Sequence, residues 1–122
     1  MQVLIDTNFL VVCAKQKIDL FEELKLMGFE VLISEQVINE LKKIANSKQK
    51  LHSRQAAELA LKILRKNKFK KISISGKYVD KAIINYADKN PSTAIATIDK
   101  ELKGKIKNKK IIIRNKKRLE VI

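Results

Sequence analysis

The 122-residue sequence predicts an α/β fold: a three-layer sandwich in which helices flank a five-stranded, mainly parallel sheet. Three observations support this prediction. Short apolar runs alternate with segments of helical periodicity. The gaps between these runs are long enough for the crossovers that parallel strands require. The chain can form one domain with a substantial core but not two, so residues 1–122 are expected to be a single domain.

The five predicted strands are apolar on consecutive positions, which is typical of strands buried on both faces of a sheet. Polar or turn-forming residues follow each run. In chain order the strands are QVLID at 2–6, FEVLIS at 29–34, KISIS at 71–75, TAIATID at 93–99 and KIIIRN at 110–115. In such a sheet, ligands bind beyond the carboxyl ends of the strands.

The predicted helices carry stripes of apolar residues between these strands. Ser34 is the expected N-cap of a helix over 34–45, and Gly28 is placed to end a shorter helix over 18–27. Helices that follow parallel strands begin at the carboxyl edge, so their first turns are expected to reach the same cleft as the strand ends. The remaining predicted helices cover residues 53–66, 77–89 and 99–107.

The strong positive charge favours an anionic partner, with nucleic acid expected before a membrane surface. Lys and Arg number 27 against 13 Asp and Glu, which gives a formal net charge of +14. A lysine-rich surface that reflects only genome bias or a hot habitat is the alternative. The basic residues gather in two runs that suit phosphate contacts, although a solvated face remains the competing interpretation. The candidate RNA contacts are Lys66, Lys68, Lys70, Lys100 and Lys103.

Several other classes are disfavoured by the sequence. Cys13 is the only cysteine, so no intrachain disulfide is possible and a buried, inert thiol in a cytoplasmic protein is expected. His52 is the only histidine, which makes a Cys–His nucleophilic site improbable. No apolar stretch is long enough to span a membrane, and no signal peptide or phosphate-binding glycine loop is expected.

Four acids are expected to converge at the carboxyl edge of the sheet. Asp6 and Asp99 end the first and fourth predicted strands, while Glu40 and Asp80 lie in the helices after the second and third. Clustered carboxylates repel unless a cation or a proton lies between them, and oxygen ligands suit Mg²⁺ or Mn²⁺. Taken singly, each acid could instead be a helix cap or a solvated helix residue.

Four motifs, in order along nearly the whole chain, resemble those of the PIN-domain nuclease family. They are LIDTNFL, SEQVINELKKI, YVDKAIINYA and AIATIDKELK. The last strand and tail, KIIIRNKKRLEVI, resemble those of short archaeal members related to ribosomal RNA processing nucleases. Many relatives carry an acidic pair at the third motif, whereas Val79 precedes Asp80 here. Some relatives have a further acid after the fourth motif, for which Glu101 is the candidate.

The resemblance implies a metal-dependent endoribonuclease in which carboxylates hold Mg²⁺ or Mn²⁺. It implies Asp6, Glu40, Asp80 and Asp99 as the catalytic, metal-binding acids and Asn8 and Thr97 as supporting groups. Single-stranded RNA or a structured precursor, for example of ribosomal RNA, is the expected substrate. A non-cleaving RNA-binding scaffold and the ribonuclease toxin of a toxin–antitoxin pair are the alternatives. A homodimer, an antitoxin partner and a ribosome-assembly partner remain open.

Overall fold

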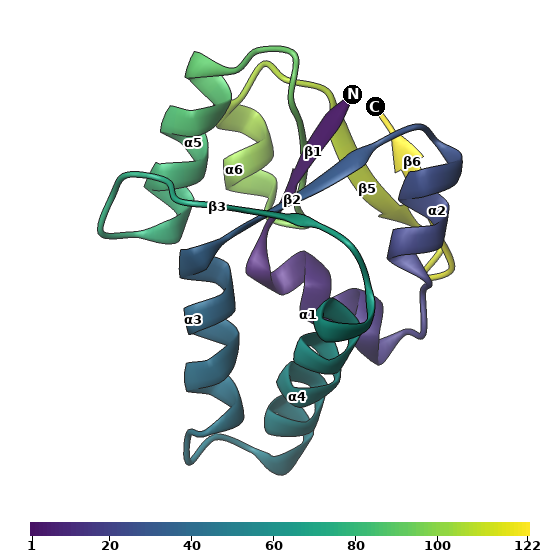
Figure 1. Cartoon of the computed structure of the whole chain (residues 1–122), viewed down its shortest axis with the longest axis vertical. Helices are drawn as coiled ribbons and strands as arrows, with labels where there is room; N and C mark the ends of the chain where they lie inside the picture. The colour runs from purple at the N-terminus through teal and green to yellow at the C-terminus, as the bar shows by residue number, and fades with distance from the viewer.

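The computed structural model describes residues 1–122, which form six strands and six helices (Figure 1). The strands are β1 (Gln2–Ile5), β2 (Glu30–Ser34), β3 (Lys70–Ile72), β4 (Ala94–Ala96), β5 (Lys110–Arg114) and β6 (Arg118–Val121). The helices are α1 (Thr7–Lys15), α2 (Leu20–Leu26), α3 (Glu35–Ala45), α4 (Leu51–Lys66), α5 (Val79–Lys89) and α6 (Lys100–Lys105). The predicted alternation of strands and helices is therefore confirmed.

The six strands form one sheet in the order β3-β2-β1-β4-β5-β6. Every neighbouring pair is parallel except β5 with β6. The central strand β1 pairs with β2 on one side and with β4 on the other, so Leu4 lies opposite both Leu32 and Ile95. This arrangement confirms the mainly parallel sheet, and it brings the carboxyl ends of β1 and β4 side by side.

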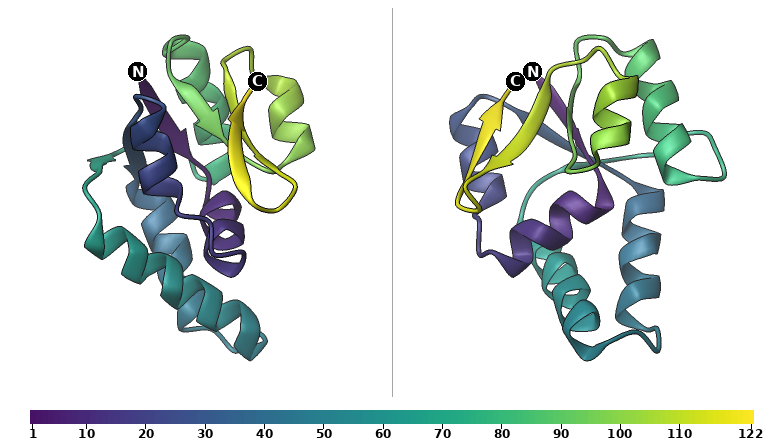
Figure 2. Two further views of the ribbon diagram at one scale, coloured as in Figure 1. Left: turned by 90° about the vertical axis from the view of Figure 1, so that its right-hand side faces the viewer. Right: turned by 180° about the vertical axis from the view of Figure 1, so that it is seen from behind.

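The core has two parts, one on each face of the sheet, as a three-layer sandwich requires. Val3 and Ile5 point to the larger part, which α1, α2, α3 and α4 cover. Leu4 points to the smaller part, where it meets Ile83 of α5 and Leu102 of α6. Figure 2 shows α5 and α6 on the side of the sheet opposite α2. Successive side chains of β1 are buried on alternate faces, which explains its unbroken apolar run.

Two elements depart from the sequence prediction. Helix α1 begins directly after Asp6, where no helix was predicted, and the strand β6 adds a sixth strand to the predicted five. Asn115 and Lys116, both with positive φ, form the turn between β5 and β6. No helix is long and apolar enough to cross a membrane.

Helices α3 and α4 form a hairpin that extends away from the sheet (Figure 1). Ser34 caps α3, because its hydroxyl accepts a hydrogen bond from the amide of Val37 (3.1 Å), as the sequence predicts. The cap fixes the direction in which α3 leaves the carboxyl end of β2. Glu40, in the second turn of α3, consequently faces the end of β1.

Candidate active site

The first acid, Asp6, is buried at the junction of β1 and α1. Only 4% of the residue is exposed. The amide of Thr7 donates to its Oδ1 (2.9 Å), and the hydroxyl of Thr97 donates to its Oδ2 (3.0 Å). Its own amide donates to the carbonyl of Ala96 at the end of β4 (2.9 Å). Asp6 thus caps α1 and at the same time has its carboxylate held from the neighbouring strand end.

Asp99 lies at the same edge of the sheet and caps α6. Strand β4 ends at Ala96, so Asp99 follows the strand by three residues. Its Oδ1 accepts from the amides of Glu101 (2.9 Å) and Leu102 (3.2 Å). Thr97 connects it to Asp6, because the Thr97 hydroxyl accepts from the Asp99 amide (3.1 Å) and donates to Asp6. Asp99 therefore caps α6 and also lies at the edge of the cleft.

Glu40 and Asp80 reach the same region from α3 and α5, and their charges affect Asp6. Burial, reinforced by repulsion from Asp80 and Glu40, raises the pKa of Asp6 to about 6, although the bonds from Thr97 and Thr7 oppose the shift. Burial, and then the charge of Asp80, also raises the pKa of Glu40. Asp6, Glu40 and Asp80 are therefore close enough for their charges to interact, whereas Asp99, the fourth acid expected from the sequence, contributes to neither shift.

The Thr7 hydroxyl is an unpartnered polar group inside this cluster. Thr7 is 1% exposed, and its Oγ1 makes no hydrogen bond. It lies near enough to lower the pKa of Glu40, but outside ordinary hydrogen-bond geometry. Buried hydroxyls normally have a partner, so this one marks a place where a polar ligand is expected. Sequence reasoning missed Thr7; its position directly after Asp6 is the signal that could have found it.

The donor set fits a hard divalent cation in its chemistry, because it consists of oxygen atoms alone. No three acidic, histidine or cysteine side chains lie close enough together to hold one ion in their present arrangement. Asp80 is exposed and Glu40 half-buried, so both side chains have room to turn toward an ion beside Asp6. Asn8 is exposed in the first turn of α1, and Thr97 is buried.

Basic side chains surround the acids, but only some are those that the sequence indicated. Lys100 and Lys103 lie on α6, directly after Asp99. Lys66 ends α4, while Lys68 and Lys70 line a different pocket at the beginning of β3. Sequence reasoning missed three cations that flank the acids, namely Lys43 and Lys77 near Glu40 and Lys81 near Asp80. Lys105, which belongs to one of the two basic runs, also lies near Asp80 and Asp99.

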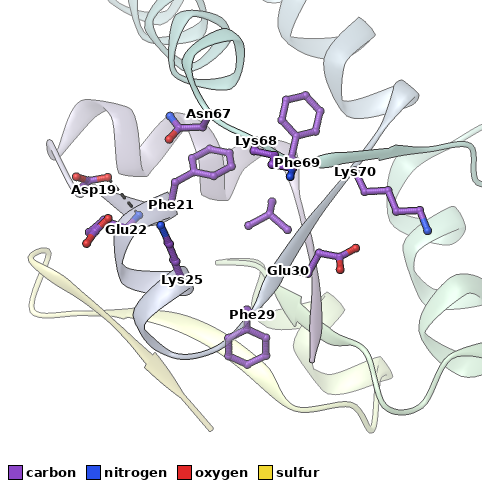
Figure 3. A pocket seen from close by; sticks show the side chains of 11 residues that line it. Asp19, Phe21, Glu22, Lys25, Phe29, Glu30, Asn67, Lys68, Phe69 and Lys70 are labelled. Carbon is purple, nitrogen blue, oxygen red and sulfur yellow. Dashed lines mark hydrogen bonds between the residues drawn. The ribbon is translucent and has the colours of Figure 1, made fainter.

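A larger cavity, of about 590 Å³, lies beside the amino ends of β2 and β3 and contains none of the predicted acids. Figure 3 shows Phe21, Phe29 and Phe69 around it, together with charged residues of both signs. Asp19, at its rim, is tied to α2 by a hydrogen bond from the amide of Glu22 (3.4 Å). Cavity size and the gathering of acids therefore point to different places, and the acids mark the candidate site.

Comparisons with known proteins identify relatives of the chain and of its fold. The family described as "PIN like domain" matches residues 3–118. Ribonuclease VapC4 of Methanocaldococcus jannaschii is 32% identical over 122 residues, covering 95% of this chain and 92% of that protein. The rRNA-processing protein fcf1 of Schizosaccharomyces pombe is 33% identical over 110 residues, or 86% of this chain, which spans 53% of that protein's length.

The solved structure of the PIN domain endonuclease Utp24 has the same fold. It superposes with a TM-score of 0.80 at 29% identity, covering 98% of this chain and 90% of that chain. The shared fold and the matches over almost the entire length lead to one assignment. The chain belongs to the PIN-like domain family of nucleases, and the relatives named above include a ribonuclease and an endonuclease.

Proposed function

We propose that this protein is a divalent-metal-dependent endoribonuclease that hydrolyses RNA phosphodiester bonds. The observation that carries the proposal is the gathering of Asp6, Glu40 and Asp80 at the carboxyl edge of the sheet, where burial first, and repulsion between the acids second, raise the pKa of Asp6 and of Glu40. A buried acid such as Asp6 that neighbouring acids repel is costly unless it serves a charged ligand. The names of the relatives, a ribonuclease and an endonuclease, support the same reaction class.

Asp6, Glu40, Asp80 and Asp99 would hold Mg²⁺ or Mn²⁺ in this proposal. Bound there, the ion supplies activation of a water nucleophile and neutralises charge on the phosphate. Thr97 and the amide of Thr7 fix both oxygens of Asp6, so this carboxylate is oriented before the ligand arrives. Asn8 and Thr97 act as supporting groups, one exposed at the start of α1 and one buried between Asp6 and Asp99.

The RNA backbone would contact basic residues beside the acids and a second group of basic residues farther from them. Lys100 and Lys103 are next to Asp99, and Lys66, Lys68 and Lys70 offer a second contact region. One relative is named a ribonuclease and another an rRNA-processing protein, so two cellular roles are open. The protein would be either a toxin with an antitoxin partner or a ribosome-assembly nuclease. A homodimer is compatible with either role.

A second candidate function, a scaffold that binds RNA without cutting it, is favoured by two observations. No three ligand side chains are close enough for one ion, and the Oδ1 atom of Asp99 is already used by two amides of α6. The scaffold predicts RNA binding that does not depend on Mg²⁺ or Mn²⁺ and no cleavage.

Incubation with end-labelled single-stranded RNA, with and without Mn²⁺, separates the two functions. The nuclease should cut only with the ion, and Asp6→Asn should abolish cutting. Asp88→Asn is the matched control, because Asp88 is an exposed acid on the same helix as Asp80 but lines no pocket with the other acids. Binding without cutting by the unchanged protein would favour the scaffold, and equal cutting by Asp6→Asn would refute the proposed site.

A further inference from the structure

An exposed aromatic side chain lies at the rim of the acid cleft. Tyr78 directly precedes α5 and is 59% exposed, whereas every other aromatic residue of the chain is buried or half-buried. It lines two adjoining pockets, of which one contains Glu40 and the other contains Asp80 and Asp99. The ring therefore stands between the acids that approach from α3 and those that approach from α5 and α6.

The loop before Tyr78 is held in place by contacts with two helices. The side-chain amide of Gln36, on α3, donates to the carbonyl of Gly76. Gly76 has a φ of +132°, and a Cβ atom there would lie 3.2 Å from the Cβ of Ala82 on α5. Glycine is thus required both for the backbone conformation and for the close approach to α5. Together these contacts determine where the Tyr78 ring lies relative to Glu40.

Two lysines accompany the exposed ring. The ammonium groups of Lys77 and Lys81 each lie 5.8 Å from the centroid of Tyr78, at the outer limit of a cation–π contact. Such exposed contacts are weaker than the stacking of a base on an aromatic ring, so a base can replace a lysine at the ring. An aromatic platform beside cations is the combination by which proteins hold single-stranded nucleic acid.

We propose that Tyr78 stacks on an unpaired base of the RNA beside the cleaved bond, while Lys77 and Lys81 contact the flanking phosphates. The inference rests on the proposed nuclease function and names the residue that would favour RNA unpaired at the cleavage site. A base inside a continuous duplex is already stacked on its neighbours and cannot use the ring without being unpaired first. Tyr78 is accordingly a substrate-positioning residue rather than a group that reacts.

Fluorescence can detect the stacking without any cleavage, because the chain contains no tryptophan. Tyr78→Trp, combined with Asp6→Asn to keep the RNA intact, places a single reporter at the proposed contact. Single-stranded oligonucleotide should quench this fluorescence, and a duplex of the same sequence should quench it much less. Leu26→Trp in the same background is the control, since Leu26 is 78% exposed at the end of α2, on the other side of the sheet from α5.

Cleavage kinetics supply the second measurement. Tyr78→Ala should lower kcat/KM on single-stranded RNA by about 5- to 150-fold, mainly through KM, since that is the range for loss of one stacked base. Tyr78→Phe should keep nearly full activity, because the ring and not the hydroxyl makes the contact. Leu26→Ala controls for removal of an exposed apolar side chain, and circular dichroism checks that each variant is folded.

Three results would overturn the inference. Wild-type kcat/KM in Tyr78→Ala, with cleavage intact, would leave the nuclease standing and refute the stacking. The stacking would also be refuted if the fluorescence of Tyr78→Trp stays unquenched when the oligonucleotide saturates binding. Anisotropy measures that saturation. If the unchanged protein neither binds nor cuts single-stranded RNA, both the stacking and the proposed function are wrong.

Discussion

At the scale of single residues, the protonation of the Asp6 carboxyl group in the candidate site affects the stability of the whole protein. Its pKa is about 6 in the folded protein against an ordinary 3.8, so the folded state binds its proton more tightly than the unfolded state. The stability from this proton is complete below pH 3.8 and is lost as the pH rises through 6. At neutral pH the ionised group therefore destabilises the fold by about 3 kcal/mol, in the absence of a cation.

Asp6→Asn should accordingly stabilise the metal-free protein at pH 8, by about 1–3 kcal/mol, and have little effect at pH 4. The substituted side chain can still accept from the Thr7 amide and donate to the Thr97 hydroxyl, so the cap of α1 is preserved. Urea unfolding at the two pH values measures the difference. Destabilisation at both pH values would show that the carboxylate matters mainly as a helix cap.

The same pair of proteins reports on the metal without an activity assay. If a divalent ion occupies the cluster, Mn²⁺ should raise the melting temperature of the unchanged protein, because a ligand that binds only the folded state stabilises it. Asp6→Asn should show a much smaller increase. An equal increase in both proteins would place the ion elsewhere.

The sequence points to some residues of the candidate site and not to others, for a physical reason. Asp6 and Asp99 are recognisable because each follows an apolar strand, and strand ends of a parallel sheet meet at one edge. Thr7 and Tyr78 acquire their roles only through contacts with distant residues. Thr7 is significant because Glu40 approaches it, and Tyr78 because Gln36 of α3 fixes the preceding loop. No local pattern around either residue reports those contacts.

At the scale of elements, α1 and β6 show where apolar patterning fails. Helix α1 is largely buried, with Phe9, Leu10, Cys13 and Ala14 in the core, so its run FLVVCA lacks a polar stripe. Burial likewise raises the pKa of the Cys13 thiol to about 12, consistent with the inert cysteine that was expected. Strand β6 is at the edge of the sheet, and its short alternating segment RLEV resembles a charged tail.

The buried side chain of Asn108 connects three segments and provides a prediction at this scale. It is 5% exposed, and its Nδ2 lies within hydrogen-bond distance of three carbonyl oxygens, those of Ala87 (3.1 Å), Asn90 (3.0 Å) and Thr93 (2.7 Å). The contacts join the end of α5, the turn before β4 and the approach to β5. Asn108→Ala should lower the free energy of unfolding by about 1–3 kcal/mol, because buried acceptors lose their donor.

Asn108→Asp is the sharper variant, since a carboxylate would face these carbonyl oxygens. The repulsion favours the protonated form in the folded state, so stability should be best near pH 4 and fall as the pH rises. Urea unfolding should find Asn108→Asp less stable than Asn108→Ala at pH 7, with a smaller difference near pH 4. Equal stabilities at pH 7 would mean that water satisfies these carbonyl groups.

At the scale of the whole molecule, a net charge of +14 makes RNA binding sensitive to salt. Contacts between lysines and phosphates release condensed counterions, so log affinity should fall linearly with log salt. The slope is about −0.7 for each neutralised phosphate on a single strand. A diffuse positive field would attract RNA as well, but it would depend on total charge and not on which lysines are present.

Two triple variants with equal charge distinguish contacts from a diffuse field. Replacing Lys66, Lys68 and Lys70 by Gln removes three charges from the proposed second contact region. Replacing Lys116, Lys117 and Arg118 by Gln removes three from the turn after β5 and the first residue of β6. Each lowers the net charge by three, from +14 to +11. If Lys66, Lys68 and Lys70 contact phosphates, the slope of log affinity against log salt should flatten by about 2 in the first variant. The slope of the second variant should change little.

The titration is best done in the Asp6→Asn background on one unstructured RNA, so that the strand stays intact. Equal flattening in both triple variants would mean that the lysines act through their summed field. No flattening in the Lys66–Lys68–Lys70 variant would confine the contacts to the immediate surroundings of the acids, where Lys100 and Lys103 lie. That outcome fits the structure too, because Lys68 and Lys70 line a pocket that contains none of the acids, and a single strand crossing the cleft need not reach them.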